Sequence, residues 1–277
     1  MGVFSNNLLA GAGGQAAGAA SLYDYQIEQS MRFDRASDTG LTRTQTTGTS
    51  RRTYTYSLWF KVSEAFDSGA AYMLFGATVT STTNYNDNTN LNNGAGANYA
   101  LMTANFKGSL SGQVQSNARI RDTGGWYHLV QRVDTTQSTA SDRVRLYLNG
   151  TQITSFNSES QPSQNYDGGF GISGNETTVG MNLDNSNFGH EFNGYIAEVI
   201  YADGTSYAPT QFGEFKNGVW IPKDYHNTTG DYGTNGFLLK YETGGALGND
   251  SSGNNNDFTV NNMDADHQVL DSPTFGS

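Results

Sequence analysis

A polar loop late in the chain carries the densest set of metal-ligand side chains in the sequence. Residues 250–257 read Asp-Ser-Ser-Gly-Asn-Asn-Asn-Asp, and five of them offer hard oxygen donors: Asp250, Ser252, Asn254, Asn256 and Asp257. Oxygen ligands gathered around a glycine are what calcium prefers in proteins. The same residue types also build ordinary turns, so a calcium loop and a tight polar turn both remain open.

A second candidate lies in the long polar segment of residues 80–98, where Tyr85 precedes Asn86 and Asp87. An aromatic ring beside short amide and carboxylate groups suits a sugar, so these three residues are predicted to bind glycan. Long loops of this kind are either functional or simply mobile, and a solvated loop is the alternative.

Nucleophilic and zinc chemistry have little support in this sequence. The four histidines, His128, His190, His226 and His267, form no i, i+4 pair and accompany no Ser or Asp motif. The absence of cysteine removes disulfides, thiol catalysis and cysteine-metal sites. His128 falls within a predicted strand, where we expect a hydrogen-bonded structural histidine.

The charge and hydropathy patterns exclude two classes of partner. The formal net charge of -11 argues against nucleic acid, because phosphate binding needs clustered Lys and Arg. The sequence has no run of about 20 apolar residues of the kind that spans a membrane. We therefore expect neither a nucleic-acid partner nor a membrane partner.

Apolar and polar side chains alternate along much of the chain, so we expect β-strands to position any site. In residues 53–62, Tyr54, Tyr56, Leu58, Phe60 and Val62 fall on one face, which predicts a strand with one face on a core. Residues 143–148 alternate in the same way and end at Asn-Gly, the strongest short hairpin signal. Residues 209–215 contain the only helical turn that we predict, and the fold is an all-β sandwich of two antiparallel sheets.

The first 20 residues differ from everything after them. Phe4, Leu8 and Leu9 precede a segment of Ala and Gly with no strand pattern. Small residues would let this segment lie close against another protein while the three apolar side chains fill pockets there. An irregular N-terminal anchoring arm over residues 1–20 and a floppy chain end are the two interpretations.

Several motifs in fixed order resemble a known superfamily. Residues 126–134 (WYHLVQRVD), 143–150 (RVRLYLNG) and 192–199 (FNGYIAEV) are similar to the laminin-G-like jelly-roll branch of the concanavalin A-like lectin/glucanase superfamily. Residues 30–33 (SMRF), 51–61 (RRTYTYSLWFK) and 218–223 (GVWIPK) resemble the type found in tailed-phage structural proteins. The resemblance implies a single two-sheet jelly roll over residues 21–277.

The glucanase relatives use a Glu-x-Asp-x-x-Glu pattern on one strand, which places an acid and a nucleophile on one sheet face. No such pattern occurs here, and the nearest pair, Glu191 and Glu198, is seven positions apart and expected on opposite strand faces. Glu198 lies in an apolar strand, where an edge or ion-paired residue is expected. Hydrolase activity is therefore the disfavoured alternative.

The resemblance implies a non-enzymatic protein of the phage virion surface. We expect a capsid decoration or head appendage that contacts other virion proteins through the arm, displays a lectin-like domain and binds host or environmental glycans. A trimer would suit a viral appendage, and weak sites would gain from many copies. A tail fibre or receptor-binding protein that recognises host glycans is the alternative.

Overall fold

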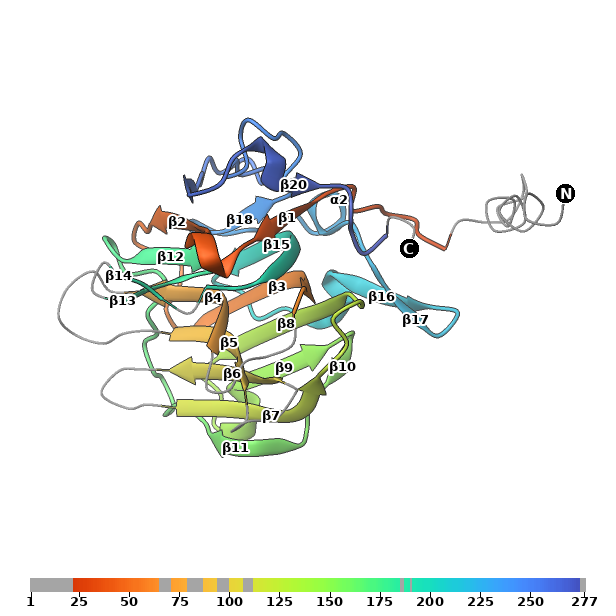
Figure 1. Ribbon diagram of the computed structural model, residues 1–277. Helices are drawn as coiled ribbons and strands as arrows, with labels where there is room; N and C mark the ends of the chain where they lie inside the picture. Colours follow the sequence, from red (N-terminus) through yellow and green to blue (C-terminus); the bar gives the residue numbers. More distant parts are fainter. Residues whose placement is uncertain are drawn as a thin grey trace, which may run out of the picture.

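The computed structural model describes residues 22–64, 71–78, 87–93, 100–106, 112–184, 187–189 and 191–274. Within these residues two antiparallel sheets of eight strands each lie face to face (Figure 1). The predicted all-β, two-sheet jelly-roll sandwich is thereby confirmed. The predicted anchor residues Phe4, Leu8 and Leu9 lie outside the described residues.

The first sheet, called sheet A, is built around the strand predicted from residues 53–62. Its order is β10 (Thr151–Gln152), β9 (Val144–Leu148), β8 (Tyr127–Asp134), β3 (Thr53–Val62), β15 (Gly194–Asp203), β1 (Ser30–Phe33) and β20 (Gln268–Val269), and β18 (Phe237–Leu239) also pairs with β15.

The second sheet, called sheet B, has the order β11 (Phe156–Ser160), β7 (Gly112–Ile120), β6 (Ala100–Phe106), β5 (Asp87–Asn93), β4 (Ala71–Thr78), β12 (Glu176–Val179), β2 (Gly40–Thr44) and β19 (Thr259–Asn261). A short hairpin of β13 (Asn182–Asp184) and β14 (Asn187–Gly189) lies beside it.

Aromatic side chains fill the space between the sheets. Phe75 of β4 stacks on Phe170 at 5.1 Å between ring centroids and meets Tyr56 of β3 at 4.5 Å. Tyr201 of β15 and Phe237 of β18 extend the same cluster. With no disulfide to hold the sheets, burial of these rings is the main stabilising contribution.

Sheet A is covered on its outer face as well. The outward residues of β3 are buried, with Ser57 1% and Trp59 5% exposed, so the expectation of a single core face was incomplete. The covering layer comes from residues 204–235, which include the hairpin β16 (Gly213–Lys216) and β17 (Val219–Pro222) and the helix α2 (Tyr225–Thr228). In Figure 1 this hairpin projects beside the sandwich, on the side of the C-terminal segment.

Two local predictions have different outcomes. Asn149 and Gly150 have φ values of 48° and 75° and join β9 to β10, so the predicted Asn-Gly hairpin is confirmed. The prediction of one helical turn was wrong. Pro209–Gln211 does form a 3-10 turn, but α2 and further 3-10 turns at Arg35–Ser37, Ala140–Asp142 and Ala265–His267 accompany it. Asp side chains cap three of these four, and a single Asp before polar residues is a weak signal in sequence.

The two ends of the described chain are hydrogen-bonded to each other. The Ile27 N–H donates to Thr274 Oγ1 at 2.9 Å, and Ser272 Oγ donates to the Ile27 carbonyl. This pairing holds residues 25–29 along the outer face of sheet A, next to β15. Among the helices of the described residues, none is long and apolar enough to cross a membrane.

Candidate functional site

A row of uncharged residues crosses the outer face of sheet B from one edge to the other. The strand registers place eight residues side by side along it: Ser160, Gln113, Asn105, Asn88, Gly76, Thr178, Thr42 and Thr259. Their side chains point away from the core because their neighbours along each strand, such as Val114 and Ala104, are buried in it.

Carboxamide groups in this row are hydrogen-bonded in series. Gln113 Nε2 donates to Asn105 Oδ1 at 3.0 Å, and Asn105 Nδ2 donates to Asn88 Oδ1 at 2.9 Å. Asn90 Nδ2 donates to the same Asn88 oxygen at 3.1 Å. Each bond fixes the orientation of an amide, so the donors and acceptors of the face have defined directions.

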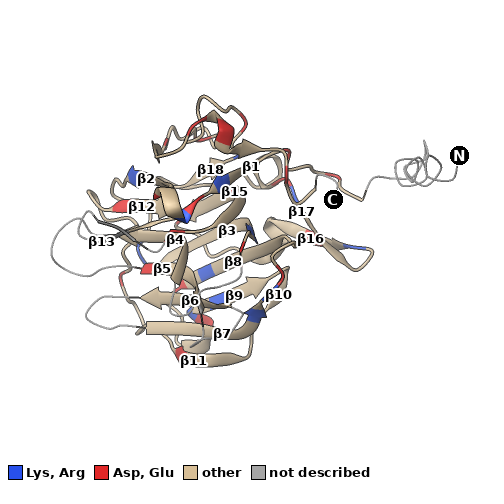
Figure 2. Ribbon diagram, viewed as in Figure 1, with Lys and Arg blue, Asp and Glu red and all other residues tan. Residues whose placement is uncertain are grey.

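A parallel chain of bonds runs one residue pair further along the strands. Asn157 Nδ2 donates to Gln115 Oε1 at 2.5 Å, and Gln115 Nε2 donates to Thr103 Oγ1 at 3.0 Å. We call the members of both chains the amide ladder: Asn88, Asn90, Thr103, Asn105, Gln113, Gln115 and Asn157. The sequence of β6 has no charged residue and that of β7 has one, Arg119, and both strands are mostly tan in Figure 2.

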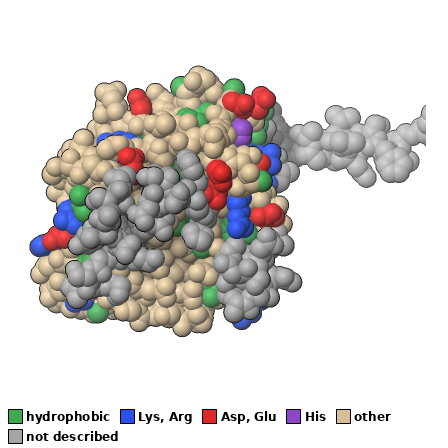
Figure 3. Space-filling view, turned by 60° about the vertical axis from the view of Figure 1, so that its left-hand side comes forward, with side chains coloured by type: hydrophobic (Ala, Val, Ile, Leu, Met, Phe, Trp, Pro, Cys, Tyr) green, Lys and Arg blue, Asp and Glu red, His purple; other side chains and the backbone are tan. Residues whose placement is uncertain are grey.

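The amide ladder is exposed to solvent at the end formed by β7 and β11 and buried at the end formed by β5. Asn88 is 8% exposed, whereas Gln113 and Asn157 are exposed and Asn105 and Gln115 are half-buried. A carboxamide offers two N–H donors and two acceptor lone pairs, so each exposed member keeps capacity beyond its ladder bond. On the side of the molecule shown in Figure 3, the charged side chains of the described residues occur in small separate groups. This chemistry suits a neutral ligand rich in hydroxyl groups.

The predicted glycan residue Asp87 does not lie on this face. It is 1% exposed, and its carboxylate accepts hydrogen bonds from Tyr166 Oη at 3.0 Å and from the Gly169 N–H at 2.7 Å. The period of two along β5 turns Asp87 inward and Asn88 outward, which the sequence analysis did not resolve. The other two predicted residues, Tyr85 and Asn86, lie outside the described residues.

The structure brings the five predicted calcium ligands together, but side-chain oxygens of Asp250, Ser252, Asn256 and Asp257 already accept hydrogen bonds from protein donors. Asp250 accepts from the N–H groups of Leu238 and Asn256, both at 2.9 Å, and from the N–H and hydroxyl of Ser252, both at 2.8 Å. Asp257 Oδ1 accepts from the Asp250 N–H at 2.8 Å. A calcium ion would have to displace these donors.

The two amides of that loop, Asn254 and Asn256, donate to the Gly236 carbonyl at 3.0 Å and 2.8 Å. They fasten the loop to the residue before β18. Within the described part of the chain, no three His, Asp or Glu side chains are grouped as metal ligands. The calcium site therefore stays a prediction, while the loop has a structural role in the fold.

The structure confirms His128 as a hydrogen-bonded structural histidine. It is fully buried, and its Nε2 lies 2.7 Å from Ser57 Oγ. Burial lowers the pKa of His128 to about 3, so the ring is neutral in ordinary buffers. A buried, neutral Ser–His pair cannot reach a substrate, and this pair is part of the packing between sheet A and its outer layer.

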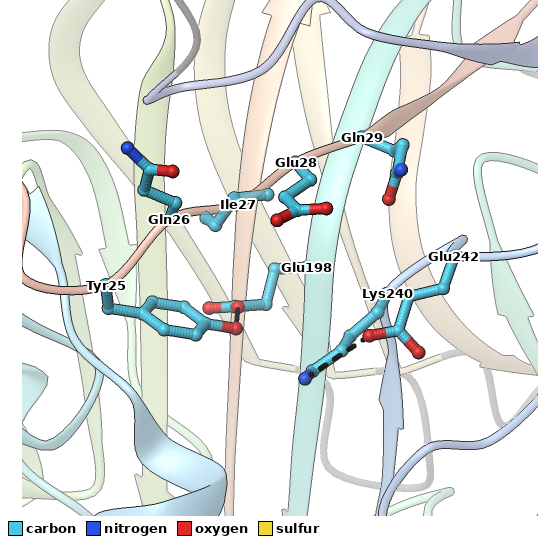
Figure 4. A pocket seen from close by; sticks show the side chains of 8 residues that line it. All are labelled: Tyr25, Gln26, Ile27, Glu28, Gln29, Glu198, Lys240 and Glu242. Carbon is cyan, nitrogen blue, oxygen red and sulfur yellow. Dashed lines mark hydrogen bonds and ion pairs between the residues drawn. The ribbon is translucent and has the colours of Figure 1, made fainter.

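Glu198 sits in a small cavity of about 200 Å³ on the outer face of sheet A (Figure 4). The lining residues come from three segments: Tyr25, Gln26, Ile27, Glu28 and Gln29 near the start of the described chain, Glu198 of β15, and Lys240 and Glu242 after β18. Tyr25 Oη donates a short hydrogen bond to Glu198 Oε2. Lys240 pairs with Glu242 at 3.5 Å rather than with Glu198.

Contrary to the sequence prediction, Glu198 is not an edge residue, and none of the described Lys or Arg side chains forms an ion pair with it. Its strand lies in the interior of sheet A, where a bulge between Ala197 and Ile200 turns two consecutive side chains, Ala197 and Glu198, to the outer face. Burial raises the pKa of the Glu198 carboxyl to about 7. The backbone of Glu198 has a φ of 42°, a left-handed conformation that residues other than glycine rarely adopt.

Sequence reasoning missed the amide ladder and the residues that surround Glu198. The ladder had a visible signal, because Asn88, Asn90 and Asn92 alternate with inward residues, as do Gln113 and Gln115. Tyr25 and Lys240 lie far from Glu198 in sequence and gave no signal. A lone carboxylate within the apolar run of β15 was the only indication of a special site there.

Comparisons with known proteins bear on the fold. The profile of the concanavalin A-like lectin/glucanases superfamily matches residues 35–205, which is more than half of the chain. Comparison with curated proteins gave no match.

Solved structures resemble the chain at low sequence identity. A putative carbohydrate binding protein from Bacteroides ovatus is 14% identical with a TM-score of 0.53, and the match covers 86% of this chain and 59% of that one. A pentraxin from Limulus polyphemus is 14% identical over 69% of this chain and 82% of its own, with a TM-score of 0.49.

Tailspike protein 2 of an Escherichia coli O157:H7 bacteriophage is 11% identical over 65% of this chain and 23% of its own, with a TM-score of 0.45. At such identities a structural likeness speaks to the fold alone. The profile match, the two-sheet architecture and the motif order agree, and the chain belongs to the concanavalin A-like lectin/glucanase superfamily.

Proposed function

We propose that this protein is a lectin-like module that binds neutral glycans through the exposed end of the amide ladder. The observation that carries the proposal is the oriented series Asn157, Gln115, Gln113 and Asn105 on three adjacent strands. Sugar hydroxyls are both donors and acceptors, and carboxamides match them in both roles. None of the ladder residues carries a charge, which favours neutral over acidic glycans.

A binding role is favoured over hydrolysis by the placement of the acidic residues. Along the row that crosses sheet B, none of the eight side chains is a carboxylate. Retaining and inverting glycosidases both need two carboxyl groups flanking the bond. Polysaccharide clearing by the purified protein would contradict the binding role, and we expect none.

The test is a glycan array followed by calorimetry on the best ligand. The double variant Gln113→Ala with Gln115→Ala removes one exposed and one half-buried amide on the outer face of the sheet, and we expect affinity to fall at least about tenfold. Gln152→Ala, an exposed amide on β10 of the other sheet, is the matched control and should bind normally. Equal binding by the double variant, or no ligand among neutral glycans, would refute the proposal.

We further propose that the module is displayed on a bacteriophage particle, as a capsid decoration or head appendage. The motif resemblance supports this context, and the anchoring arm with Phe4, Leu8 and Leu9 would contact other virion proteins. Deletion of residues 2–20 should leave the sandwich folded but remove the protein from purified particles. Unchanged incorporation would refute the anchoring role.

A receptor-binding role at the tail is the competing proposal, and the glycan would then lie on the host surface. Immunolabelling of intact particles separates the two, because label on the head supports decoration and label on the tail supports receptor binding. Loss of glycan binding on Tyr85→Ala would assign the polar segment 80–98 to the glycan site. Sedimentation of the full chain tests the expected trimer.

A further inference from the structure

We propose that the cavity at Glu198 binds a primary ammonium group, such as that of an amino sugar or of a lysine side chain. The site lies on the outer face of sheet A, whereas the amide ladder lies on sheet B. It is therefore a second site, and it stands or falls independently of the proposed glycan-binding function.

The charge around the cavity favours a cation. Glu28, Glu198 and Glu242 line it, against the single ammonium of Lys240. Lys240 forms an ion pair with Glu242, with 3.5 Å between Nζ and Oε1. The two further ionisable groups near Glu198 are Asp224 and Tyr232, and neither of them supplies positive charge. An entering ammonium would meet an excess of carboxylate oxygen.

Glu198 provides the anchoring oxygen. The side chain is 4% exposed, lines the cavity, and takes one hydrogen bond, from Tyr25 Oη to Oε2. Among the described residues, none donates a hydrogen bond to its other oxygen, Oε1. This oxygen belongs to a side chain that lines the cavity, and an ammonium N–H entering there would give it a charge-assisted hydrogen bond.

The shape of the cavity sets the size of the ligand. At about 200 Å³ it is smaller than pockets for drug-sized molecules, which measure about 300–1,000 Å³. A single sugar residue or an extended alkylamine fits that space. The Tyr25 ring forms one wall, where a cation gains from the aromatic face, and the Gln29 amide can meet ligand hydroxyls (Figure 4).

The backbone also points to a site. Glu198 keeps a left-handed φ of 42° inside a bulge, a conformation that costs about 1–3 kcal/mol in a non-glycine residue. The bulge turns Glu198 toward the cavity, and a regular strand would have turned it into the core. Strained residues that hold a buried polar group in a cavity are typical of ligand sites.

Binding of a cation should be linked to the ionisation of Glu198. Burial raises the pKa of the free carboxyl to about 7, and a bound ammonium favours the carboxylate and lowers that pKa. The fraction of ionised Glu198 rises about tenfold between pH 6 and pH 8, so affinity for an amine should rise by a similar factor. A neutral ligand would show no such rise.

The experiment is an NMR titration of the full chain with carbon-13 in the Glu carboxyl groups. D-Glucosamine and Nα-acetyl-lysine amide are the amine probes for the two ligand sources, and N-acetylglucosamine is the neutral control. We expect at least one amine to shift the Glu198 signal saturably. For the lysine amide, whose ammonium stays protonated, affinity should be about tenfold higher at pH 8 than at pH 6. Equal binding of N-acetylglucosamine, or no saturable shift with either amine, would overturn the proposal.

Variants give the second readout. Glu198→Gln keeps the size of the side chain and should weaken amine binding at least tenfold, measured by calorimetry at pH 8. Lys240→Met removes the competing cation and should strengthen amine binding. Glu214→Gln removes an exposed carboxylate outside the cavity and should bind as the parent does. Undiminished binding by Glu198→Gln would refute the site even if the amine probes bind.

Discussion

The indole N–H of Trp220 donates to Nδ1 of His128 at 2.9 Å, across 92 residues of sequence. The bond settles the tautomer, because Nδ1 is the acceptor and the proton must lie on Nε2, which then donates to Ser57 Oγ. Trp59 stacks on the same imidazole at 4.4 Å. His128 thus joins β8 of sheet A to the β16–β17 hairpin of the outer layer.

The first prediction follows from the burial of His128. Its folded-state pKa of about 3 lies below the ordinary 6.5, so the unfolded chain binds more protons between those values. The free energy of unfolding should therefore fall as the pH is lowered, by about 2 kcal/mol from this residue between pH 7 and pH 5.

Urea denaturation of the parent and of His128→Gln at both pH values measures this slope. The variant should lose that part of the pH dependence, whereas His226→Gln, at a half-buried histidine, should keep it. An unchanged slope in His128→Gln would contradict the buried neutral imidazole.

The second prediction concerns Glu198 and has the opposite sign. Its folded-state pKa of about 7 lies above the ordinary 4.5, so the folded protein binds more protons between those values and loses stability as the pH rises through 7. Glu198→Gln should raise the free energy of unfolding by about 2–3 kcal/mol at pH 8 and change it little at pH 4. The control Glu214→Gln should leave the free energy of unfolding unchanged at both pH values. A Glu198→Gln variant that is less stable than the parent at pH 8 would contradict the raised pKa of Glu198.

The third prediction concerns Gly150, at the turn between β9 and β10. Its φ is 75°, and an added Cβ would lie 2.2 Å from Cε3 of Trp220. Gly150→Ala should lower the free energy of unfolding by about 2–4 kcal/mol, through backbone strain and displacement of the indole. Gly245→Ala, where the Cβ would meet nothing within 4 Å, should cost less than about 0.5 kcal/mol. Thermal unfolding followed by tryptophan fluorescence compares them, and equal costs would contradict the packing of Trp220.

The fourth prediction separates the structural and metal roles of Asp250. Because its carboxylate accepts hydrogen bonds from Leu238, Ser252 and Asn256, Asp250→Asn should lower the free energy of unfolding by about 2–3 kcal/mol. Chelator or millimolar calcium should leave the Tm of the parent unchanged. A rise in Tm with calcium that is absent in Asp250→Asn would establish the metal site instead.

The predictable part of the fold was the local part. Alternation in β3, the Asn-Gly turn after β9 and the motif order predicted strands, a hairpin and a sandwich, because side-chain period and turn conformation depend on neighbouring residues. The amide ladder was present in the same signal, since Asn88 and Asn90 of β5 and Gln113 and Gln115 of β7 alternate with inward residues.

Non-local register decided the rest. Whether Asp87 or Asn88 faces outward depends on which strand pairs with β5, and a shift of one residue reverses every side chain. The environment of Glu198 depends on a bulge in β15 and on Tyr25, 173 residues away, and both exist only once sheet A is assembled. Sequence spacing fixes neither of them, because burial, pKa and cavity shape arise from segments that meet only in the folded chain.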